Sequence, residues 1–250
     1  GPVQEARLDE LDILFMRKDP PFDLEYIAAT YVLERAEEAG VLVMNRPQSL
    51  RDANEKIFAS WFPQCCAPTV ITCSMKTLRE FHASKGCIVV KPIDLMGGRS
   101  VFVVAEGDLN ANVIFEEITR RGTRFVQAQG YIPEIADTGD KRILLIDGEP
   151  VPHTLVRRPA KGEGRANMAA GGTPEGGALS DRDRWICGQI GPPLRARGLT
   201  FVGIDVIGDW LTEINVTSPT GIRELDKFFG LDIAGQLLDV AEKQWRKKAV

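Results

Sequence analysis

The sequence predicts a mixed α+β fold. Strand-sized apolar runs alternate with helical patterns along most of the 250 residues, as expected for a protein built from layers of sheets and helices. Several of the strands are separated by short hairpin-like turns, which join antiparallel strands rather than parallel ones. The content of 44% hydrophobic and 26% charged residues is typical of a soluble globular chain, long enough for one large domain or two ordinary ones.

The first elements predict a small parallel unit. Residues 13–16 form a short apolar strand, and a second apolar strand follows at 41–45. Between them lies a helical stretch that begins at Asp23, a suitable N-cap, and ends before Gly40, a suitable C′ residue. Short connections between a strand, a helix and a strand favour right-handed parallel pairing. Because two strands and one helix cannot cover both faces of a sheet, we expect this unit to belong to a larger layer.

The remaining elements follow in two groups. The first group is predicted as a helix at 49–58, a strand at 69–73, a helix to 84 capped by Ser74, strands at 87–90 and 101–105, a helix at 110–121 and a strand at 124–128. The second group is predicted as strands at 141–146 and 151–156, a helix at 181–197, strands at 201–207 and 211–216, and a final helix at 232–247. The stretch 159–178 is rich in Gly and Ala and predicts a long mobile loop, of a length that usually serves as a lid or a linker.

Composition excludes several classes of protein. No apolar run approaches the roughly 20 residues that a membrane-spanning helix needs, so we expect no membrane partner. The net charge is −4, from 31 basic and 35 acidic residues, which gives no overall positive field to hold nucleic acid. Five cysteines without a C-x-x-C pair predict a reduced, cytoplasmic protein. With only two histidines, catalysis must depend on lysines, arginines, carboxylates and backbone amides.

The last predicted hairpin carries a candidate metal site. Glu213 and Asn215 are two residues apart on an apolar strand, so both project from one face. Asp205 lies on the preceding strand. A three-residue turn at 208–210, which we predict, places Asp205 opposite Glu213, whereas a two-residue turn would pair it with Thr212. Three oxygen ligands on one face suit Mg²⁺, whose coordination is usually completed by nucleotide phosphates; polar side chains that face solvent are the plainer alternative.

A lysine and a glycine turn indicate phosphate binding. Lys91 ends a buried strand, and Gly97-Gly98 follows shortly after it. A lysine can contact a phosphate as a point charge, and glycines let backbone N–H groups approach phosphate oxygens. Since the segment matches neither the P-loop nor the dinucleotide-binding glycine pattern, a strand-ending lysine and an ordinary turn explain it equally well by themselves.

Basic residues recur at strand positions that otherwise look buried. Arg142 and Arg157 are the clearest cases, beside Lys141 and Arg158, and Arg165 lies in the long loop. A buried arginine is costly without an anionic partner, and its fork of donors suits a carboxylate or a phosphate. The first two arginines therefore favour an anionic ligand.

Taken together, these motifs resemble the ATP-grasp fold, and longer phrases resemble the bacterial glutathione synthetase family. The ATP-grasp motifs are Lys56 in Asn54-Glu-Lys56, Lys91 with Gly97-Gly98, the hinge Gln127-Ala-Gln129-Gly-Tyr131-Ile-Pro133, Asp140-Lys-Arg142, and Asp205 with Glu213-Ile-Asn215. The family phrases are Met16-Arg-Lys-Asp-Pro-Pro-Phe-Asp23, Asn45-Arg-Pro-Gln-Ser-Leu-Arg-Asp52, Arg165-Ala-Asn-Met-Ala-Ala-Gly-Gly172 and Thr212-Glu-Ile-Asn-Val-Thr-Ser-Pro219. The likeness covers nearly the whole chain.

The resemblance implies an ATP-dependent carbon–nitrogen ligase. Its implied substrates are γ-glutamylcysteine and glycine, and its cofactors are ATP and Mg²⁺, with Mn²⁺ as an alternative. In the family the cysteinyl carboxylate takes the γ-phosphoryl group, and glycine attacks the resulting acyl phosphate. The implied domains are the end of a truncated N-terminal α/β (pre-ATP-grasp) domain at 1–54, a small ATP-grasp lobe at 55–128 and a large lobe at 129–250 with a lid at 159–178.

The resemblance also assigns residues to roles. Nucleotide contacts are implied for Lys56, Lys91, Gly97 and Gly98 at the phosphates, Gln129, Gly130, Tyr131 and Ile132 at the adenine, and Asp140 at the ribose. Metal ligands are implied at Asp205, Glu213 and Asn215. Catalytic roles are implied for Arg142 and Arg157 around the acyl phosphate and for Arg165 and Asn167 in the lid. Substrate contacts are expected from Arg17, Asp19, Ser218 and Thr220.

Two other functions are alternatives. A different ATP-grasp carboxylate–amine ligase, such as a glutamate-adding enzyme, would share the nucleotide and metal residues, and only the substrate phrases favour the glutathione reaction. A truncated ATP-binding fragment without catalysis is the second alternative, because chains of the family normally begin with further strands and helices. A homo-oligomer is expected if that N-terminal region is present.

Overall fold

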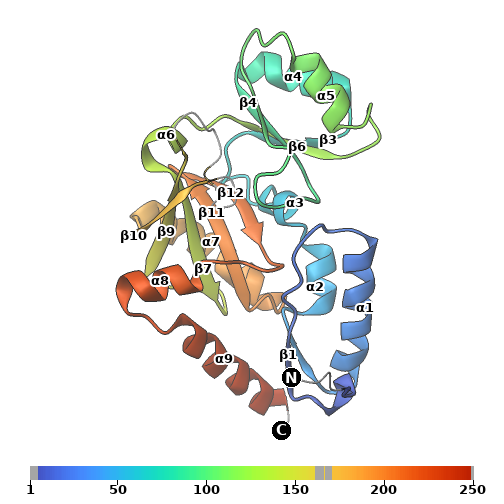
Figure 1. Cartoon of the computed structure of the whole chain (residues 1–250), viewed down its shortest axis with the longest axis vertical. Helices are drawn as coiled ribbons and strands as arrows, with labels where there is room; N and C mark the ends of the chain where they lie inside the picture. Colours follow the sequence, from blue (N-terminus) through green and yellow to red (C-terminus); the bar gives the residue numbers. More distant parts are fainter. Residues whose placement is uncertain (1–4, 161–165, 167–170, 249–250) are drawn as a thin grey trace.

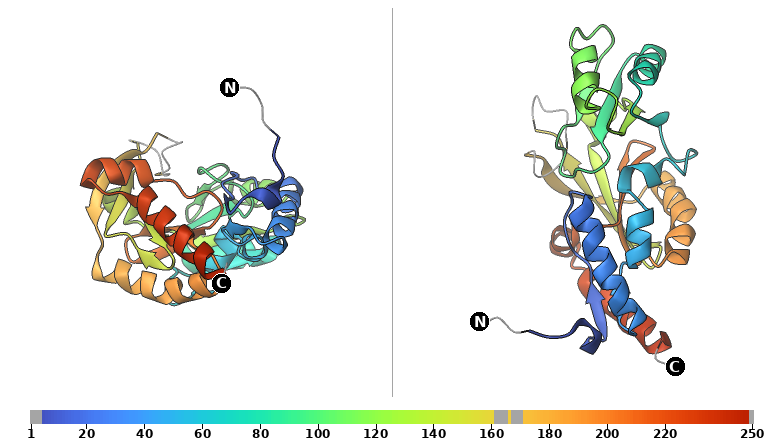
Figure 2. Two further views of the ribbon diagram at one scale, coloured as in Figure 1. Left: turned by 90° about the horizontal axis from the view of Figure 1, so that it is seen from below. Right: turned by 90° about the vertical axis from the view of Figure 1, so that its right-hand side faces the viewer.

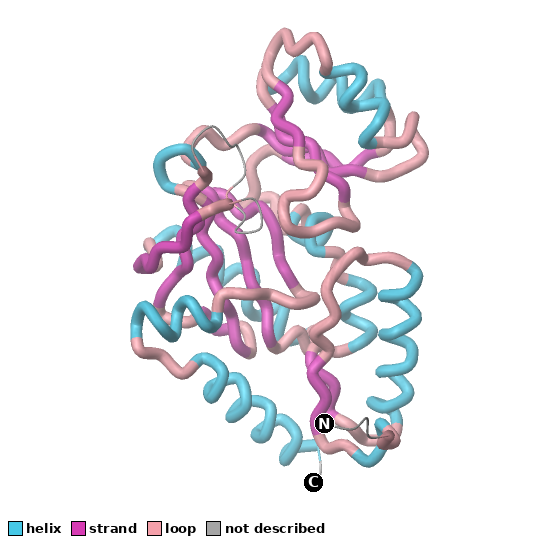
Figure 3. The backbone as a smooth tube through the Cα atoms, viewed as in Figure 1, coloured by secondary structure: helices cyan, strands magenta, loops and turns pink. Residues whose placement is uncertain are grey.

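The computed structural model describes residues 5–160, 166 and 171–248. Three sheets follow one another along the long axis of the molecule: a two-stranded sheet at one end, a large sheet in the middle and a four-stranded sheet at the other end (Figures 1 and 3). Helices pack on these sheets, so the mixed α+β class predicted from the sequence is confirmed. In the described part of the chain, no helix is long and apolar enough to cross a membrane.

The N-terminal unit is the predicted parallel strand–helix–strand. Its elements are η1 (Leu8–Glu10), β1 (Ile13–Phe15), α1 (Leu24–Glu38) and β2 (Leu42–Met44), with β1 and β2 paired in parallel. The Asp23 side chain accepts a hydrogen bond from the Tyr26 amide at 2.9 Å, as expected of an N-cap. Val41 and Val43 join the same buried core as residues of the large sheet. The large lobe therefore supplies the packing partner that two strands and one helix lack by themselves.

Two short helices replace the single helix predicted at 49–58, so that prediction is wrong. They are α2 (Pro47–Asp52) and α3 (Glu55–Ala59). Asn54 separates them, because its side-chain oxygen accepts hydrogen bonds from the amides of Lys56 and Ile57, both at 3.2 Å, and starts a new helix. The new helix places Lys56 in the cleft between the two larger sheets.

The four-stranded sheet and two helices form the small lobe. In spatial order its strands are β3 (Thr69–Thr72), β6 (Val126–Gly130), β4 (Ile88–Pro92) and β5 (Phe102–Val104), all antiparallel. Its helices are α4 (Met75–Lys85) and α5 (Ala111–Ile118), which lie on the side away from the large lobe (Figure 1). They bury a separate core that includes Leu78, Val90 and Phe115. The other side of the sheet is left to face the large lobe.

The large lobe is built on an antiparallel sheet. In spatial order its strands are β10 (Thr173–Ala178), β9 (His153–Arg158), β7 (Asp140–Ile146), β11 (Phe201–Ile207) and β12 (Trp210–Asn215), with β8 (Glu149–Pro150) beside β7. Its helices are α6 (Ile135–Thr138), α7 (Asp181–Ala196), α8 (Ile222–Phe229) and α9 (Ile233–Lys248). Ile143 and Leu145 of β7 share a core with α7, whereas Leu144 and Ile146 share one with α8 and α9. The sheet thus lies between helices on both faces (Figure 2).

Four elements of the large lobe differ from the prediction. β10 occupies the end of the loop predicted at 159–178, and α6, β8 and α8 lie where no element is predicted. The β10 sequence Thr-Pro-Glu-Gly-Gly-Ala has the composition of a loop. However, a Cβ on Gly176 would lie 2.6 Å from the Phe229 ring, so the close packing of this strand on α8 requires the glycine. Most of the remaining predicted loop lies outside the described residues.

The β11–β12 hairpin pairs Asp205 with Glu213 as predicted, but not through the predicted turn. Ile207 pairs with Trp210, so the turn has two residues, and the prediction of three is wrong. A bulge next to Asp205 shifts the register and restores its pairing with Glu213. The extra residue is Thr212, whose hydroxyl donates to the Asp205 carbonyl at 3.1 Å. The additional residue therefore lies within the strand and not in the turn.

Asn45 joins the N-terminal unit to the large sheet. Its buried Nδ2 donates to the carbonyl oxygens of Phe201 and Val216, both at 2.8 Å, and its Oδ1 accepts from the Phe201 amide at 2.9 Å. These bonds hold the start of β11 and the end of β12. They therefore position the two strands that carry the candidate metal ligands.

Replacing Asn45 with alanine should lower the free energy of unfolding by about 2–4 kcal/mol, because three buried backbone groups lose a hydrogen-bond partner. Urea unfolding followed by circular dichroism measures this change. Gln48→Ala is the control, since Gln48 is exposed on α2 and should change stability by less than about 0.5 kcal/mol. Wild-type stability in Asn45→Ala would contradict the anchoring role.

Candidate active site

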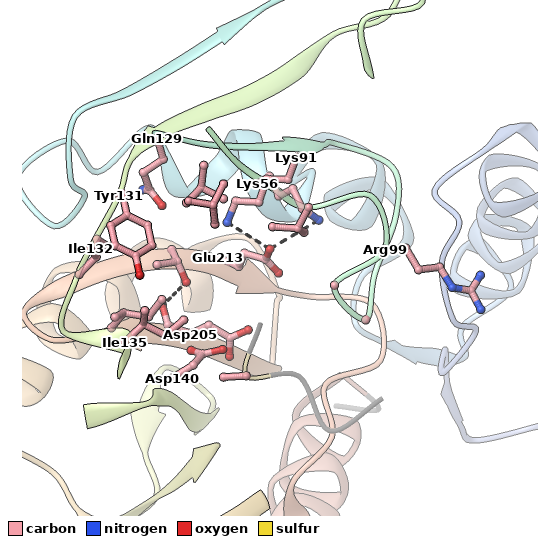
Figure 4. Close-up of a pocket in the computed structure, with 18 of the residues that line it drawn as sticks. Lys56, Lys91, Arg99, Gln129, Tyr131, Ile132, Ile135, Asp140, Asp205 and Glu213 are labelled. Carbon is pink, nitrogen blue, oxygen red and sulfur yellow. Dashed lines mark hydrogen bonds and ion pairs between the residues drawn. The ribbon is translucent and has the colours of Figure 1, made fainter. Parts of the chain in front are cut away.

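A cleft between the small and large lobes contains the residues assigned to the nucleotide (Figure 4). Small-lobe strands, the loop at 95–99, the segment that connects the lobes at 129–132, and the β11–β12 hairpin all line it. The predicted nucleotide residues that line it are Lys56, Lys91, Gly97, Gly98, Gln129, Gly130, Tyr131, Ile132 and Asp140. Folding thus gathers side chains that are up to about one third of the chain apart in sequence.

The strand register gathers charged residues on one face of the large sheet. Arg142 on β7 lies opposite Asp205 on β11, and Asp140 on β7 lies opposite Arg157 on β9. Asp205 also lies opposite Glu213 on β12. Residues directly opposite one another in antiparallel strands project from the same face. These five side chains therefore converge beneath the small lobe.

Asp205 is the centre of a buried ion-pair network. Arg142 donates to its carboxylate through Nε at 2.5 Å and through Nη2 at 2.9 Å, and Arg157 Nη2 lies 2.9 Å from Asp205 Oδ1. Arg157 also donates to Asp140 at 2.5 Å, and Asn215 donates to Asp205 at 3.1 Å. The anionic partners that the two buried arginines require are thus carboxylates of the same sheet face.

The network gives its two aspartates different proton affinities. Burial by itself would raise the pKa of Asp205, but the charges of Arg142 and Arg157 outweigh it and hold that pKa well below the usual range. Burial raises the pKa of Asp140 to about 6, because the opposing charge of Arg157 offsets it only in part. Asp140 Oδ1 and Arg157 Nε are buried and have no hydrogen-bond partner among the described residues. Asp140 therefore keeps one acceptor that is sealed from solvent and has no partner in the described part of the chain.

Two lysines face Glu213 of β12 across the cleft. The Nζ atoms of Lys91 and Lys56 lie 3.4 Å and 3.7 Å from Glu213 Oε1 (Figure 4). Lys56 Nζ also donates to the Leu95 carbonyl at 2.7 Å and so holds the loop that carries Gly97-Gly98. Burial would raise the pKa of Glu213, but the two lysine charges outweigh it and lower that pKa. One carboxylate is thus flanked by two cations.

The side chains at this position fit a divalent metal that takes some of its ligands from the protein and the rest from a substrate. They are Asp205, Glu213 and Asn215. The described residues contain no cluster of three or more His, Cys, Asp and Glu side chains that could hold a metal ion. Two carboxylates and one amide on neighbouring strands are hard oxygen donors. Such a small set suits Mg²⁺, which takes one or two carboxylates and completes its coordination with phosphates and water.

A second cavity adjoins the cleft and shares Asp205 and Glu213 with it. Its wall combines the two arginines of the ion-pair network with the loop that follows β12. The other residues that line it are Pro20, Glu55, Met96, Gly97, Leu155, Asn215, Thr217, Ser218, Pro219 and Thr220. The cavity therefore opens on the same carboxylates as the cleft and contains a different set of polar groups.

The predicted substrate residues fall into two groups. Ser218 and Thr220 line the second cavity, but Arg17 and Asp19 are not among its lining residues. Instead, Arg17 Nη2 donates to the Pro219 carbonyl at 2.7 Å, and Asp19 accepts a hydrogen bond from the Ser218 hydroxyl. The N-terminal pair thus holds the loop that forms the wall.

The lid residues Arg165 and Asn167 lie outside the described residues. Ala166 between them is buried and lines the cleft. This position of the predicted lid therefore lies at the cleft, while the lid itself and the roles of Arg165 and Asn167 stay predictions.

Glu55 and Gly203 are among the residues at the site that carry no role in the sequence analysis. Glu55 lines the second cavity, and its place between Asn54 and Lys56 is the only signal for it. Gly203 lies beside Arg142, and a Cβ there would be 2.9 Å from the Arg142 Cδ. A glycine within an apolar strand is a signal for such a close approach, and here it leaves room for the buried arginine.

A cleft between two sheets, with lysines on one side and paired carboxylates on the other, defines an ATP-grasp ligase. The fold is similar to that of D-cycloserine synthetase DcsG, with a TM-score of 0.69 at 14% identity, covering 86% of this chain and 78% of that chain. It is also similar to the ATP-grasp ligase PsnB complexed with minimal precursor, Mg and ADP, with a TM-score of 0.61 at 23% identity, covering 87% of this chain and 67% of that chain. These likenesses show the fold alone.

The chain belongs to the prokaryotic glutathione synthetase family. The ATP-grasp domain of that family matches residues 55–230, and its N-terminal domain matches residues 1–51. The glutathione synthetase of Pseudomonas syringae pv. tomato is 59% identical over 240 residues, which cover 96% of this chain and 75% of the relative. The protein is therefore an ATP-dependent ligase of glutathione synthesis that uses a divalent metal.

Asp140→Asn should change how stability depends on pH. The folded pKa of about 6 lies above the ordinary value of about 3.9, so ionisation of Asp140 destabilises the folded protein, and this cost grows as the pH rises from about 4 to about 7. Asparagine cannot ionise. The unfolding free energy of the wild type relative to the variant should therefore fall by about 3 kcal/mol over that range. Urea unfolding of both proteins in a pH series measures this difference in unfolding free energy. A difference that is independent of pH would contradict the raised pKa of Asp140.

Proposed function

We propose that the cleft and the second cavity join γ-glutamylcysteine to glycine at the expense of ATP, with Mg²⁺ as the metal and Mn²⁺ as its substitute. The observation that carries this proposal is the arrangement around Glu213, where Lys56 of α3 and Lys91 of the small lobe face the carboxylate. Arg142 and Arg157 lie beside it at Asp205. Phosphoryl transfer to a carboxylate needs such a concentration of cations and metal ligands.

ATP is proposed to lie in the cleft with its adenine along residues 129–132 and its ribose near Asp140. The amides of Gly130 and Tyr131 donate to the carbonyls of Pro68 and Cys87, at 2.9 Å and 3.1 Å, and so fix this segment against the small lobe. The position of the Asp140 carboxylate in the wall of the cleft supports a role as acceptor for a ribose hydroxyl. Both ends of the nucleoside would then be positioned by rigid elements.

The phosphates are proposed to contact Lys56, Lys91 and Gly97-Gly98, and the metal is proposed to bind Asp205, Glu213 and Asn215. When bound, the metal neutralises phosphate charge and polarises the γ-phosphoryl group. The two lysines already lie within hydrogen-bonding or ion-pair distance of Glu213. They are therefore placed to serve phosphates bound beside the same carboxylate.

The reaction is proposed to run in two steps. The cysteinyl carboxylate attacks the γ-phosphorus of ATP, so that an O–P bond forms while the bond to ADP breaks. The glycine amine then attacks the carbonyl carbon, inorganic phosphate leaves, and the amine loses its proton to solvent. Arg142 and Arg157 are proposed to stabilise the negative charge around the acyl phosphate, since both line the second cavity. Arg165 and Asn167 are proposed to close over it and exclude water.

The peptide substrate is proposed to lie against the loop 218–220. Ser218 and Thr220 would contact it directly, because both line the cavity. Arg17 and Asp19 would act through the loop, which they hold by hydrogen bonds to Pro219 and Ser218. In this arrangement the N-terminal unit contributes to substrate binding mainly through the loop, while its Pro20 lines the cavity.

We also propose a domain division at 1–54, 55–128 and 129–250 and a cytoplasmic location. The separate core between Leu78 and Ala128 supports a small lobe within 55–128, although Phe58 and Ala59 of α3 pack in the core of the large lobe. The five free thiols support a reducing compartment. A homo-oligomer is proposed from exposed apolar side chains on α1, among them Leu24 and Val32.

Glu213→Gln should lower the metal-dependent rate of glutathione formation at least about 100-fold, because it removes a negative ligand from the metal site. The shape of the side chain is kept, so circular dichroism should report an unchanged fold. Glu242→Gln on the exposed side of α9 is the control and should keep the wild-type rate. Full activity of Glu213→Gln would remove the metal assignment.

ADP release should depend on both substrates. A coupled assay should show rapid release with γ-glutamylcysteine and glycine together and only slow release when either is omitted, because the acyl phosphate forms on the dipeptide and is consumed by the amine. Glutamate in place of glycine should give no product. Equal ADP release with and without the substrates would contradict ligation and favour nucleotide binding without catalysis.

A further inference from the structure

Glu55 is a buried carboxylate in the wall of the second cavity. It lies in the first turn of α3, where 8% of the residue is exposed. Its Oε1 accepts hydrogen bonds from the amide of Thr217 at 3.1 Å and from the hydroxyl of the same residue at 2.8 Å. Asn54 before it caps the helix, and Lys56 after it reaches the cleft. The position of Glu55 is thus fixed by the contacts of its two neighbours in sequence and by its hydrogen bonds to the loop after β12.

Glu55 differs from the other carboxylates of the cavity because it has no ion-pair partner among the described residues. Asp205 forms ion pairs with arginines and Glu213 with lysines, but Glu55 forms none within 4.0 Å among the described residues. Its Oε2 has no hydrogen-bond partner among them either, and it is not one of the atoms that are sealed from solvent. A buried carboxylate without a direct cationic partner is costly, and burial raises the pKa of Glu55 against the opposing effects of Lys56 and the Thr217 donors.

The reaction brings cations to this cavity. Both γ-glutamylcysteine and glycine carry an ammonium group as well as a carboxylate. Arg142 and Arg157 suit the anionic groups and repel the cationic ones. Asp205 and Glu213 are assigned to the metal. Glu55 is therefore the carboxylate of the described wall that stays available for an ammonium group.

We propose that Glu55 binds the ammonium group of an amino-acid substrate through Oε2, while Oε1 stays with Thr217. This inference rests on the proposed function, since it takes the two substrates from it. The ammonium group supplies the cation that the buried carboxylate lacks, and Glu55 in turn orients the substrate relative to the two arginines. The substrate is thus held by charges of opposite sign in the same cavity wall.

A purely structural role for Glu55 predicts different behaviour. In that case the carboxylate only holds Thr217, and a neutral acceptor of the same shape should replace it. Glu55→Gln is such a replacement, because its amide oxygen can still accept both hydrogen bonds from Thr217. Thr217→Val is the matched variant, because it removes the hydroxyl donor and keeps the charge of Glu55. The two variants separate the charge from the hydrogen bond.

Initial rates with ATP, γ-glutamylcysteine and glycine varied in turn test the proposal on the full chain. Glu55→Gln should raise KM for one of the two amino substrates about 10-fold or more, with KM for ATP changed less than about 2-fold. Thr217→Val should change the same KM less than about 3-fold, and Glu55→Asp should restore part of the affinity. Unchanged KM for both amino substrates in Glu55→Gln, or equal effects of Glu55→Gln and Thr217→Val, would overturn it.

The desamino analogue glutarylcysteine identifies which ammonium group is bound. If Glu55 binds the dipeptide, Glu55→Gln should weaken the binding of γ-glutamylcysteine and leave the binding of glutarylcysteine unchanged. If Glu55 binds glycine, only KM for glycine should rise. Either result supports the proposal. Calorimetric titration of the dipeptide and of glycine in the presence of a non-hydrolysable ATP analogue gives the same comparison without turnover. A wild-type chain that forms no glutathione would contradict the proposed function, whereas equal binding of both substrates by wild type and Glu55→Gln would overturn the role of Glu55.

Discussion

The hydrogen-bond register of β7 with its two neighbours is the constraint on which the site depends. It sets Arg142 opposite Asp205 and Asp140 opposite Arg157, and a shift of one residue in either pairing would turn these side chains to the opposite face. The same strand continues into the apolar run at 143–146, whose alternate residues fill two cores. Packing at one end of β7 therefore fixes the charged end, so the energy that holds the register is mostly that of buried apolar side chains.

Charge compensation is the second feature of the site. The buried cations and anions of the large-lobe face neutralise one another over distances of 2.5–2.9 Å, which offsets the cost of removing them from water. Glu213 is compensated in the same way by ion pairs with Lys56 and Lys91, which lie across the cleft. The groups proposed for phosphate, metal and acyl phosphate are thus held in position by one another. Such preorganisation suits a reaction in which the protein positions charges and performs little covalent chemistry.

The loop after β12 connects this site to the N-terminal unit. Asn45 holds Val216, Glu55 holds Thr217, and Arg17 holds Pro219. These contacts come from three segments that are far from the loop in sequence. The N-terminal unit is therefore part of the wall of the second cavity, which explains in physical terms why a small two-stranded layer accompanies the two lobes.

The sequence by itself determined most of the helices and strands and the parallel N-terminal unit, because apolar periodicity and capping residues such as Asp23 act locally. It also identified the buried arginines, since their cost without partners is general. Only the tertiary structure decided the β10 strand, whose glycines pack on Phe229, and the bulge that keeps Asp205 opposite Glu213 despite a two-residue turn. It likewise decided the place of Glu55. These features depend on contacts between distant segments, and no local pattern encodes such contacts.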